Sequence, residues 1–137
     1  MKIIICSSMI FSKELIGIRE ELLKQEHQVI LPAFVEEYAQ LESPDEMHKE
    51  SAKNKIEHDL IRRYFDEIKQ GDAVLIINKR RHGIDNYIGG NVFLEMGFAH
   101  ILNKKIFLLN PIPDMGYADE IIAMKPAILN GNLNLIR

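Results

Sequence analysis

A pair of glycines followed by a carboxylate is the part of the sequence with the clearest potential for chemistry. Gly89 and Gly90 open a predicted helix, and Glu95 follows about one turn later among apolar residues. The glycines let a ligand approach the exposed N–H groups of the first turn. The helix dipole favours an ionised Glu95 and its apolar neighbours exclude water, so the carboxylate could attack a sugar carbon and form a covalent glycosyl intermediate. Judged by spacing alone, stabilising its own helix or pairing with a lysine is the commoner role for such a glutamate.

The residues after the first apolar run offer hydroxyl and N–H groups to an anion. Ser7, Ser8 and Met9 join that run to the next predicted helix. Segments of this kind bind anions, although serines at a helix start are also ordinary caps. The segment has neither the Gly-x-Gly-x-x-Gly spacing of a dinucleotide loop nor the Gly-Lys-Ser/Thr of a P-loop, so those two classes of site are disfavoured.

The polar segment 78–90 is the second place where a ligand could be held. Four potential cations lie together in it, at Lys79, Arg80, Arg81 and His82. They could bind a phosphate, although a solvated turn is the commoner explanation for such a run. Asn86 and Tyr87, just before the glycines, could hydrogen-bond to a base or stack on it.

Two further reactive groups lie in less suggestive places. Asp72 precedes a predicted strand, at its amino end. Capping the turn after Gly71 is as good an explanation for this residue as a functional role. Cys6 lies inside an apolar run, and we expect it to be buried and inert, not a nucleophile. A single cysteine excludes an internal disulfide, and no Cys/His cluster has metal-ligand spacing, so neither a metal nor a cofactor is predicted.

Length and composition limit the class of protein. A chain of 137 residues predicts a single domain over residues 1–137, and 47% hydrophobic with 27% charged residues excludes a disordered chain. A formal net charge of −3 provides no basic field, so nucleic acid is not an expected partner. The apolar start is too short for a signal peptide, and no segment approaches the ~20 apolar residues of a membrane span. We therefore expect a cytoplasmic protein with no membrane partner.

Short unbroken apolar runs alternate with longer segments of helical period. This alternation is typical of a parallel sheet with crossover helices. The predicted strands are 3–6, 28–31, 73–77, 105–109 and 127–129, and the predicted helices are 12–25, 53–70, 91–102 and 118–124. Ser12 is expected to cap the first helix, and Gly71 to end the second. The order predicts an α/β fold, a three-layer sandwich around a five-stranded parallel sheet.

The carboxyl ends of parallel strands are where such sheets bind ligands. The segments expected there are 7–11, 32–34, 78–90 and 110–113. Residues 33–51 are acidic and show little apolar periodicity, which predicts a solvated loop with short helical pieces. A lid over the site is the alternative.

Several segments, in the same order along the chain, resemble motifs of the nucleoside 2-deoxyribosyltransferase superfamily, which includes a branch of nucleotide N-glycoside hydrolases. They are residues 2–9, 27–32, 71–75, 89–99 and 104–109. The most specific is Gly-Gly-Asn-Val-Phe-Leu-Glu-Met-Gly-Phe-Ala at 89–99. The resemblance therefore extends over most of the chain, from residue 2 to residue 109.

The resemblance implies roles for several residues. In that superfamily the glutamate matching Glu95 attacks the anomeric carbon of the deoxyribose, and the aspartate matching Asp72 protonates or orients the departing base. Residues matching Ser7, Ser8 and Met9 line the sugar or phosphate side. The resemblance also implies a flavodoxin-like, Rossmann-like strand order 2-1-3-4-5 and a homo-oligomer in which a neighbouring subunit often completes the pocket.

We therefore expect an enzyme that cleaves the N-glycosidic bond of a (deoxy)nucleoside or its 5'-monophosphate through a covalent glycosyl intermediate, and transfers the sugar to another base or to water. Its small-molecule substrate would contact the first loop together with Asn86, Tyr87, Gly89, Gly90 and Asn91. The basic segment after residue 78 favours a phosphorylated substrate. The alternatives are a nucleotide-binding module without catalysis and a hydrolase of another N-glycoside such as NAD. The pattern does not distinguish transfer from hydrolysis, one base from another, or deoxyribose from ribose.

Overall fold

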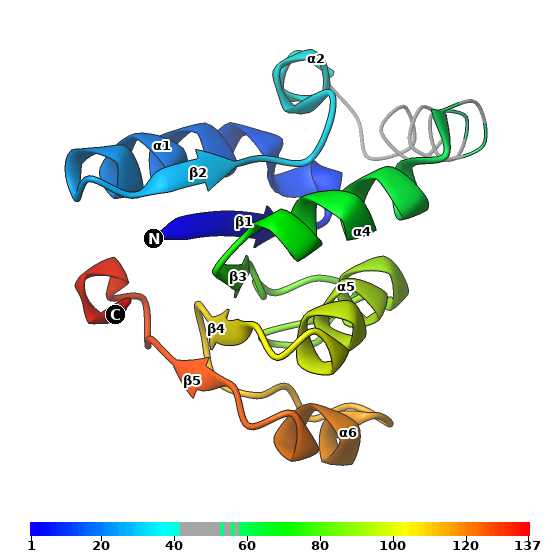
Figure 1. Ribbon diagram of the computed structural model, residues 1–137. Coiled ribbons are helices and arrows are strands. Elements are labelled where there is room, and N and C mark those ends of the chain that lie inside the picture. The colour runs from blue at the N-terminus through cyan, green and yellow to red at the C-terminus, as the bar shows by residue number, and fades with distance from the viewer. Residues whose placement is uncertain (42–52, 54–55, 57) are drawn as a thin grey trace.

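The computed structural model describes residues 1–41, 53, 56 and 58–137 and contains a five-stranded, all-parallel sheet of order β2-β1-β3-β4-β5. The strands are β1 (Lys2–Cys6), β2 (Gln28–Ile30), β3 (Ala73–Ile76), β4 (Lys105–Leu108) and β5 (Ala127–Ile128). The α-helices are α1 (Ser12–Lys24), α2 (Val35–Ala39), α4 (Leu60–Gln70), α5 (Gly90–Ile101) and α6 (Ala118–Ala123), with 3-10 turns η1 (Met9–Phe11) and η2 (Leu133–Leu135). The α/β class and the strand order expected from the sequence are both confirmed (Figure 1).

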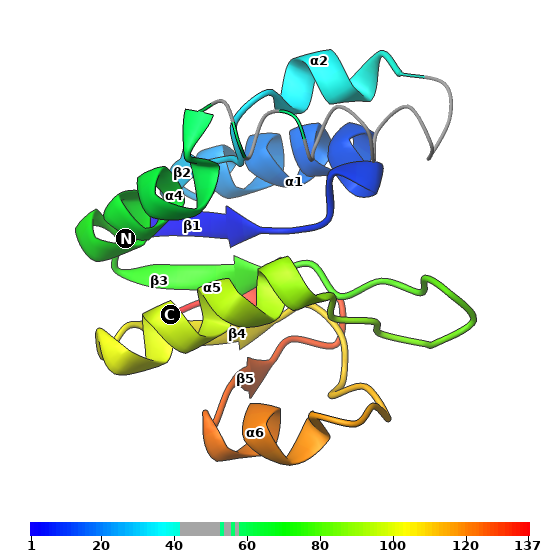
Figure 2. The ribbon, with the colours of Figure 1, turned by 90° about the vertical axis from the view of Figure 1, so that its right-hand side faces the viewer.

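Side chains alternate along the strands, so each central strand contributes apolar residues to both faces of the sheet. Helices or loops pack on both of these faces. In β1, Ile3 and Ile5 pack with α1 and the C-terminal segment, whereas Ile4 and Cys6 pack on the side of α4, α5 and α6. The central strands are therefore buried on both faces, which explains their unbroken apolar runs. Figures 1 and 2 show α4, α5 and α6 together on one side of the sheet and α1 on the other.

Two helices differ in detail from the sequence prediction. Ser12 is the first residue of α1 and its hydroxyl donates to the Met9 carbonyl, because η1 leads directly into the helix and Phe11 occupies the capping position. Within the helix predicted over residues 53–70, the described residues Lys53, Ile56 and His58 are helical, Asp59 forms a turn with a left-handed backbone (φ 47°), and α4 begins at Leu60. Residues 54, 55 and 57 lie outside the described part of the chain.

The acidic segment 33–51 is described only as far as residue 41. Within that part, α2 buries Val35 and Tyr38. The prediction of short helical pieces is therefore confirmed for α2, and residues 42–51 lie outside the described part of the chain. The lid remains a prediction.

The long segment after β3 extends beyond the carboxyl ends of the strands (Figure 2). Its base is fixed by Asn78, whose side chain donates to the carbonyls of Asn110 and Pro111 and accepts from the Asn110 N–H. Asn110 in turn donates its side-chain amide to the Asn78 carbonyl. The loops after β3 and β4 are thus held together where a ligand site is expected.

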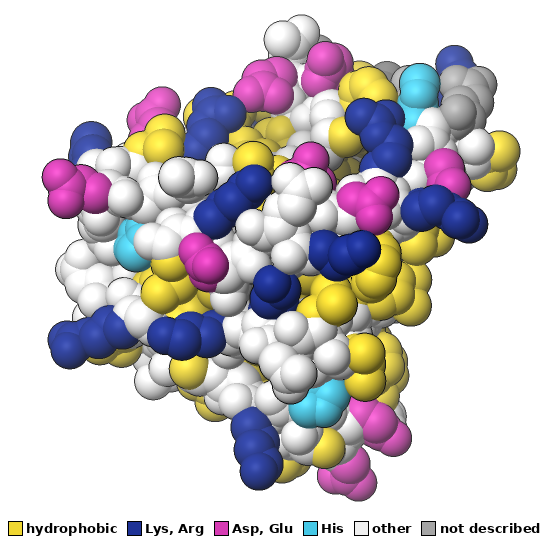
Figure 3. Space-filling view, viewed as in Figure 1, with side chains coloured by type: hydrophobic (Ala, Val, Ile, Leu, Met, Phe, Trp, Pro, Cys, Tyr) yellow, Lys and Arg dark blue, Asp and Glu magenta, His cyan; other side chains and the backbone are white. Residues whose placement is uncertain are grey.

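The surface carries scattered charges of both signs and one apolar concentration. Figure 3 shows basic and acidic side chains spread over one face, with hydrophobic side chains gathered on the side where α5 lies. No helix among the described residues is long and apolar enough to cross a membrane.

Gly71 ends α4 where the chain passes close to β1, and this close approach generates a prediction. A Cβ placed on Gly71 would lie 2.6 Å from Cγ1 of Ile4, a fully buried residue. We expect Gly71→Ala to lower the free energy of unfolding by about 1–3 kcal/mol, the usual effect of overpacking. Chemical denaturation measures it.

Gly17 provides the control. It lies in α1, is exposed, and has open space around the position of a Cβ. Gly17→Ala should raise the free energy of unfolding by about 1 kcal/mol, because alanine favours a helix over glycine. Equal effects of the two substitutions would contradict the role given to Gly71.

Candidate active site

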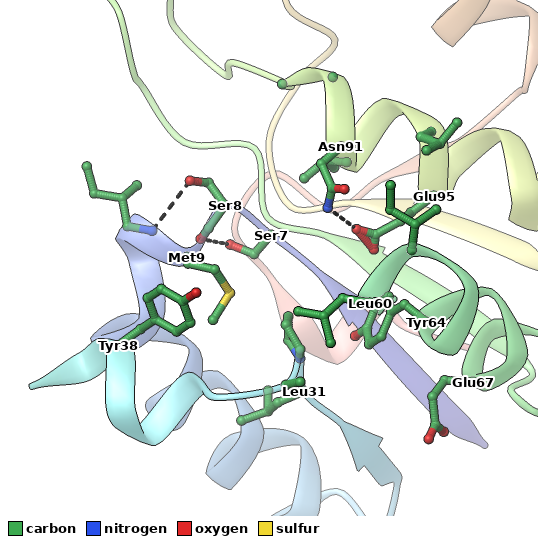
Figure 4. A pocket seen from close by; sticks show the side chains of 18 of the residues that line it. Ser7, Ser8, Met9, Leu31, Tyr38, Leu60, Tyr64, Glu67, Asn91 and Glu95 are labelled. Carbon is green, nitrogen blue, oxygen red and sulfur yellow. Dashed lines mark hydrogen bonds between the residues drawn. The ribbon is translucent and has the colours of Figure 1, made fainter. Parts of the chain in front are cut away.

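A cavity of about 580 Å³ lies at the carboxyl ends of the strands, at the point where strand order reverses between β1 and β3. Its walls come from the loops after β1, β2 and β3, from α2, and from the facing sides of α4 and α5. Figure 4 shows side chains from these elements around it. A volume of this size fits a small organic ligand, and the location is the usual one for parallel sheets.

Glu95 lies in this cavity on the second turn of α5. Its side chain is only 6% exposed, and its Oε1 accepts a hydrogen bond from Nδ2 of Asn91 at 2.8 Å (Figure 4). Asn91 lies four residues earlier on the same helix face, so the two side chains meet. A largely buried carboxylate that lines a cavity is a candidate for covalent or acid–base chemistry.

The surroundings of Glu95 include a thiol and a phenol from other elements. Burial raises the pKa of the Cys6 thiol well above its usual range, and the charge of Glu95 and a hydrogen bond to it raise that pKa further. Burial also raises the pKa of the Tyr64 phenol, with smaller contributions from Cys6 and Glu95. Tyr64 donates its hydroxyl to the Ile5 carbonyl and lines the cavity from α4. Both groups therefore remain protonated near neutral pH.

The loop after β1 and the loop after β3 meet at another wall of the cavity. Nη1 of Arg81 donates to Oγ of Ser8 at 2.7 Å, and the Ser8 Oγ also accepts from the Ile10 N–H. Ser7 donates its hydroxyl to the Ser8 carbonyl. Arg81 is held in place by paired backbone hydrogen bonds with Ile84. A guanidinium beside serine hydroxyls can bind a phosphate or carboxylate.

Most residues predicted for the site lie around the cavity. Those that line it are Ser7, Ser8, Met9, Tyr87, Gly89, Gly90, Asn91 and Glu95. Asn86 is next to the lining and adopts a left-handed backbone (φ 61°). Of the four neighbouring cations, Arg81 and His82 line the cavity, whereas Arg80 pairs with Asp85.

Asp72 is not brought to the cavity. It is exposed, and its Oδ2 accepts the Lys2 N–H at 2.7 Å. It lies at the amino end of the four-residue strand β3, roughly 13 Å along the strand from the end that borders the cavity. Its contact with Lys2 ties the start of β3 to β1, which is a structural role, and its side chain is not part of the cavity lining.

Several cavity residues were not singled out from the sequence. They are Tyr38 from α2 and Arg63, Tyr64 and Glu67 from α4. Of these, only Tyr64 carries a signal that the sequence could have given, because its hydroxyl lies among the apolar residues of α4. The others share no local motif with the strand ends, so their proximity appears only in the folded chain.

Comparison with known proteins supports the fold. No protein-family model and no curated protein matches the chain. Among solved structures, the CMP N-glycosidase BcmB of Clostridium botulinum is similar, with 16% identity over 93% of this chain and 85% of that chain, at a TM-score of 0.51. A 2-deoxyribosyltransferase of Bacillus psychrosaccharolyticus shares 25% identity over 79% of this chain and 71% of that chain, at a TM-score of 0.45. The first likeness agrees, at the level of the fold, with the resemblance inferred from the sequence motifs.

The pair of Arg81 and Ser8 generates a prediction about anions. We expect Arg81→Leu to weaken binding of inorganic phosphate or a nucleoside monophosphate by at least about tenfold, because it removes a charge-assisted hydrogen-bond donor. Ligand-induced stabilisation in thermal denaturation measures the affinity.

Arg80→Leu is the matched control. Arg80 is in the same loop with its charge paired to Asp85, outside the cavity lining. If both arginine substitutions weaken phosphate binding equally, the cavity wall at Arg81 is not the anion site.

Proposed function

We propose that the protein cleaves the N-glycosidic bond of a nucleoside or nucleoside 5'-monophosphate, with Glu95 as the nucleophile. The observation that carries this proposal is the largely buried carboxylate of Glu95 in the wall of the cavity at the strand ends. The fold that the chain shares with a CMP N-glycosidase supports the reaction class. The motif 89–99, which contains Glu95, supports it independently.

In the proposed reaction an oxygen of Glu95 attacks the anomeric carbon of the bound sugar. The bond between that carbon and the base nitrogen breaks, and the base leaves with the bonding electron pair and takes a proton from water. The sugar is then an ester of Glu95, and attack on the same carbon by water or by a second base releases the carboxylate. Asn91 orients one carboxylate oxygen throughout.

The wall formed by the loops after β1 and β3 supports a phosphorylated substrate. Arg81, Ser7 and Ser8 provide a guanidinium and two hydroxyls at the edge of the cavity. The solved structure with a similar fold is named for its action on CMP, a nucleoside 5'-monophosphate. We therefore propose that the 5'-phosphate lies at Arg81 and that the sugar lies between this wall and Glu95.

Removal of the proposed nucleophile tests the function. Glu95→Ala should lower base release from the accepted substrate by at least about 10³-fold while the protein stays folded, because it removes the attacking group. Wild-type protein and variant are incubated with a panel of nucleosides, their 5'-monophosphates and NAD, with and without a second free base, and the products are separated.

Asp72→Ala is the matched acidic control. Asp72 lies at the opposite end of β3, so its substitution should leave base release within about threefold of wild type. Undiminished turnover by Glu95→Ala would refute the assignment of the nucleophile. Saturable binding without any released base in wild type would favour the non-catalytic module, and nicotinamide release from NAD would favour the other hydrolase.

We also propose that the protein forms a homo-oligomer through the outer surface of α4 and α5. An apolar groove of about 390 Å³ lies there, lined by Phe65, Phe93, Leu94, Gly97, Phe98, Ile101 and Met124. No charged side chain among the described residues lines it. Exposed apolar surface of this kind favours association, and Leu94 and Phe98 also line the cavity, so a second copy would pack against the wall of the site.

Ile101 allows this interface to be tested. It is 79% exposed, so Ile101→Glu should leave the fold intact while placing a charge in the groove. We expect a shift towards monomer in light scattering coupled to gel filtration. Ile122→Glu, on α6 at 55% exposure and outside the groove, is the control, and an oligomer unaffected by Ile101→Glu would place the interface elsewhere.

A further inference from the structure

A proline interrupts the hydrogen-bond ladder between β1 and β2 beside the cavity. In the parallel pairing of these strands, the Gln28 N–H donates to the Met1 carbonyl. Such bonds recur at every second residue of each strand, so the Ile5 carbonyl would accept from the N–H of residue 32. Residue 32 is Pro32, which lines the cavity and has no N–H to donate.

Tyr64 supplies the donor that the ladder lacks. Its hydroxyl reaches from α4 and donates to the Ile5 carbonyl. Backbone carbonyls inside a protein need such partners, so the contact commits the single phenolic proton to the backbone. Burial raises the pKa of the phenol, which therefore keeps this proton. Towards a ligand, the oxygen of Tyr64 can then only accept a hydrogen bond.

The position of Tyr64 brings this oxygen to the wall of the cavity next to Glu95. Tyr64 is half-buried and lines the cavity, as Glu95 does (Figure 4). The helices that carry these residues pack together at the same level, where the rings of Phe65 and Phe98 meet edge to face with centroids 5.1 Å apart. Phe65 follows Tyr64 directly, and Phe98 lies one turn after Glu95. The two functional side chains therefore come from adjoining walls.

The stereochemistry of a nucleoside indicates which ligand group would meet the phenolic oxygen. In a β-nucleoside the base and the 5'-carbon lie on one face of the sugar ring, and the 2'- and 3'-hydroxyls lie on the other. A nucleophile that displaces the base attacks from the face opposite to it, which is the face that carries the hydroxyls. A side chain on the wall next to Glu95 therefore faces groups that can donate a hydrogen bond.

We propose that Tyr64 is a specificity-determining residue, which accepts a hydrogen bond from a sugar hydroxyl on the face attacked by Glu95. The orientation of the sugar rests on the proposed function. The substrate class is then a nucleotide whose sugar carries a free 2'- or 3'-hydroxyl at this point. A sugar in which that hydroxyl is absent, methylated or replaced by fluorine is disfavoured, because none of these forms can donate.

Removing each partner of the contact in turn tests the proposal. The ligands are the 5'-monophosphates of cytidine and adenosine and their 2'-deoxy and 3'-deoxy forms, and calorimetry measures their affinities in a Glu95→Gln background, which lacks the proposed nucleophile. We expect Tyr64→Phe to weaken binding of the ribonucleotide about tenfold, and binding of the form without the contacted hydroxyl by less than about twofold. An equal penalty for all three sugars, as a merely structural role would give, or no penalty for any, would overturn the proposal.

Tyr117→Phe is the matched control. The Tyr117 hydroxyl also donates to a backbone carbonyl, that of Ile88, but neither residue lines the cavity. Its substitution should leave every affinity within about twofold. The same sugar-dependent loss in Tyr117→Phe would overturn the assignment to Tyr64.

Fluorinated nucleotides keep the proposal testable even where Tyr64→Phe does not fold. With Tyr64 intact, the 2'-fluoro or the 3'-fluoro form should bind about tenfold more weakly than the ribonucleotide, because fluorine cannot donate. Equal affinity of both fluorinated forms and the ribonucleotide would overturn the proposal.

The binding comparisons separate this proposal from the proposed function, because they require no turnover. Failure of wild type to release a base from any compound would refute the proposed function, while the affinities would still decide whether Tyr64 accepts from a sugar hydroxyl. Base release by wild type together with a penalty that does not depend on the sugar would overturn the role of Tyr64 alone. Absence of binding by every nucleotide would overturn both.

Discussion

The burial of one carboxylate at the carboxyl end of β1 is the constraint on which the site depends. Removing an ionised group from water is costly unless hydrogen bonds compensate for the lost hydration. For Glu95 one such hydrogen bond comes from the side-chain amide of Asn91 on the same helix. A protein keeps such a group buried where its reactivity is used, so the cost of burial is itself an argument for function.

The parallel sheet turns this local feature into a site. The strand order reverses between β1 and β3, so the connections after these strands diverge and leave a space at their carboxyl ends. The loop after β1 brings Ser8, the loop after β3 brings Arg81, and α5 brings Glu95 into the wall of one cavity. A guanidinium with serine hydroxyls and a buried carboxylate around one space suit a substrate with a phosphate and a sugar, which is why we propose a nucleoside monophosphate.

Local patterns recovered much of this arrangement. The unbroken apolar run of β3 indicated a strand buried on both faces, and the glycines before α5 indicated a helix start close to a ligand. The same patterns failed where the backbone departs from regular geometry, as at Asp59, whose left-handed conformation interrupts the predicted helix before α4. The family resemblance implied a catalytic role for Asp72. Its place before β3 puts it at the amino end of that strand, away from the carboxyl end that borders the cavity.

The sequence by itself predicted the fold class and the end of the sheet at which a ligand is expected, which follow from periodicity and from the rules of parallel sheets. It singled out Glu95 through the motif 89–99 and the family resemblance. Only the tertiary structure decided that Tyr64 from α4 and Arg81 from the loop after β3 share the cavity with Glu95. Those relations join residues far apart in the chain, and they exist only once side chains from the sheet and the helices pack against each other.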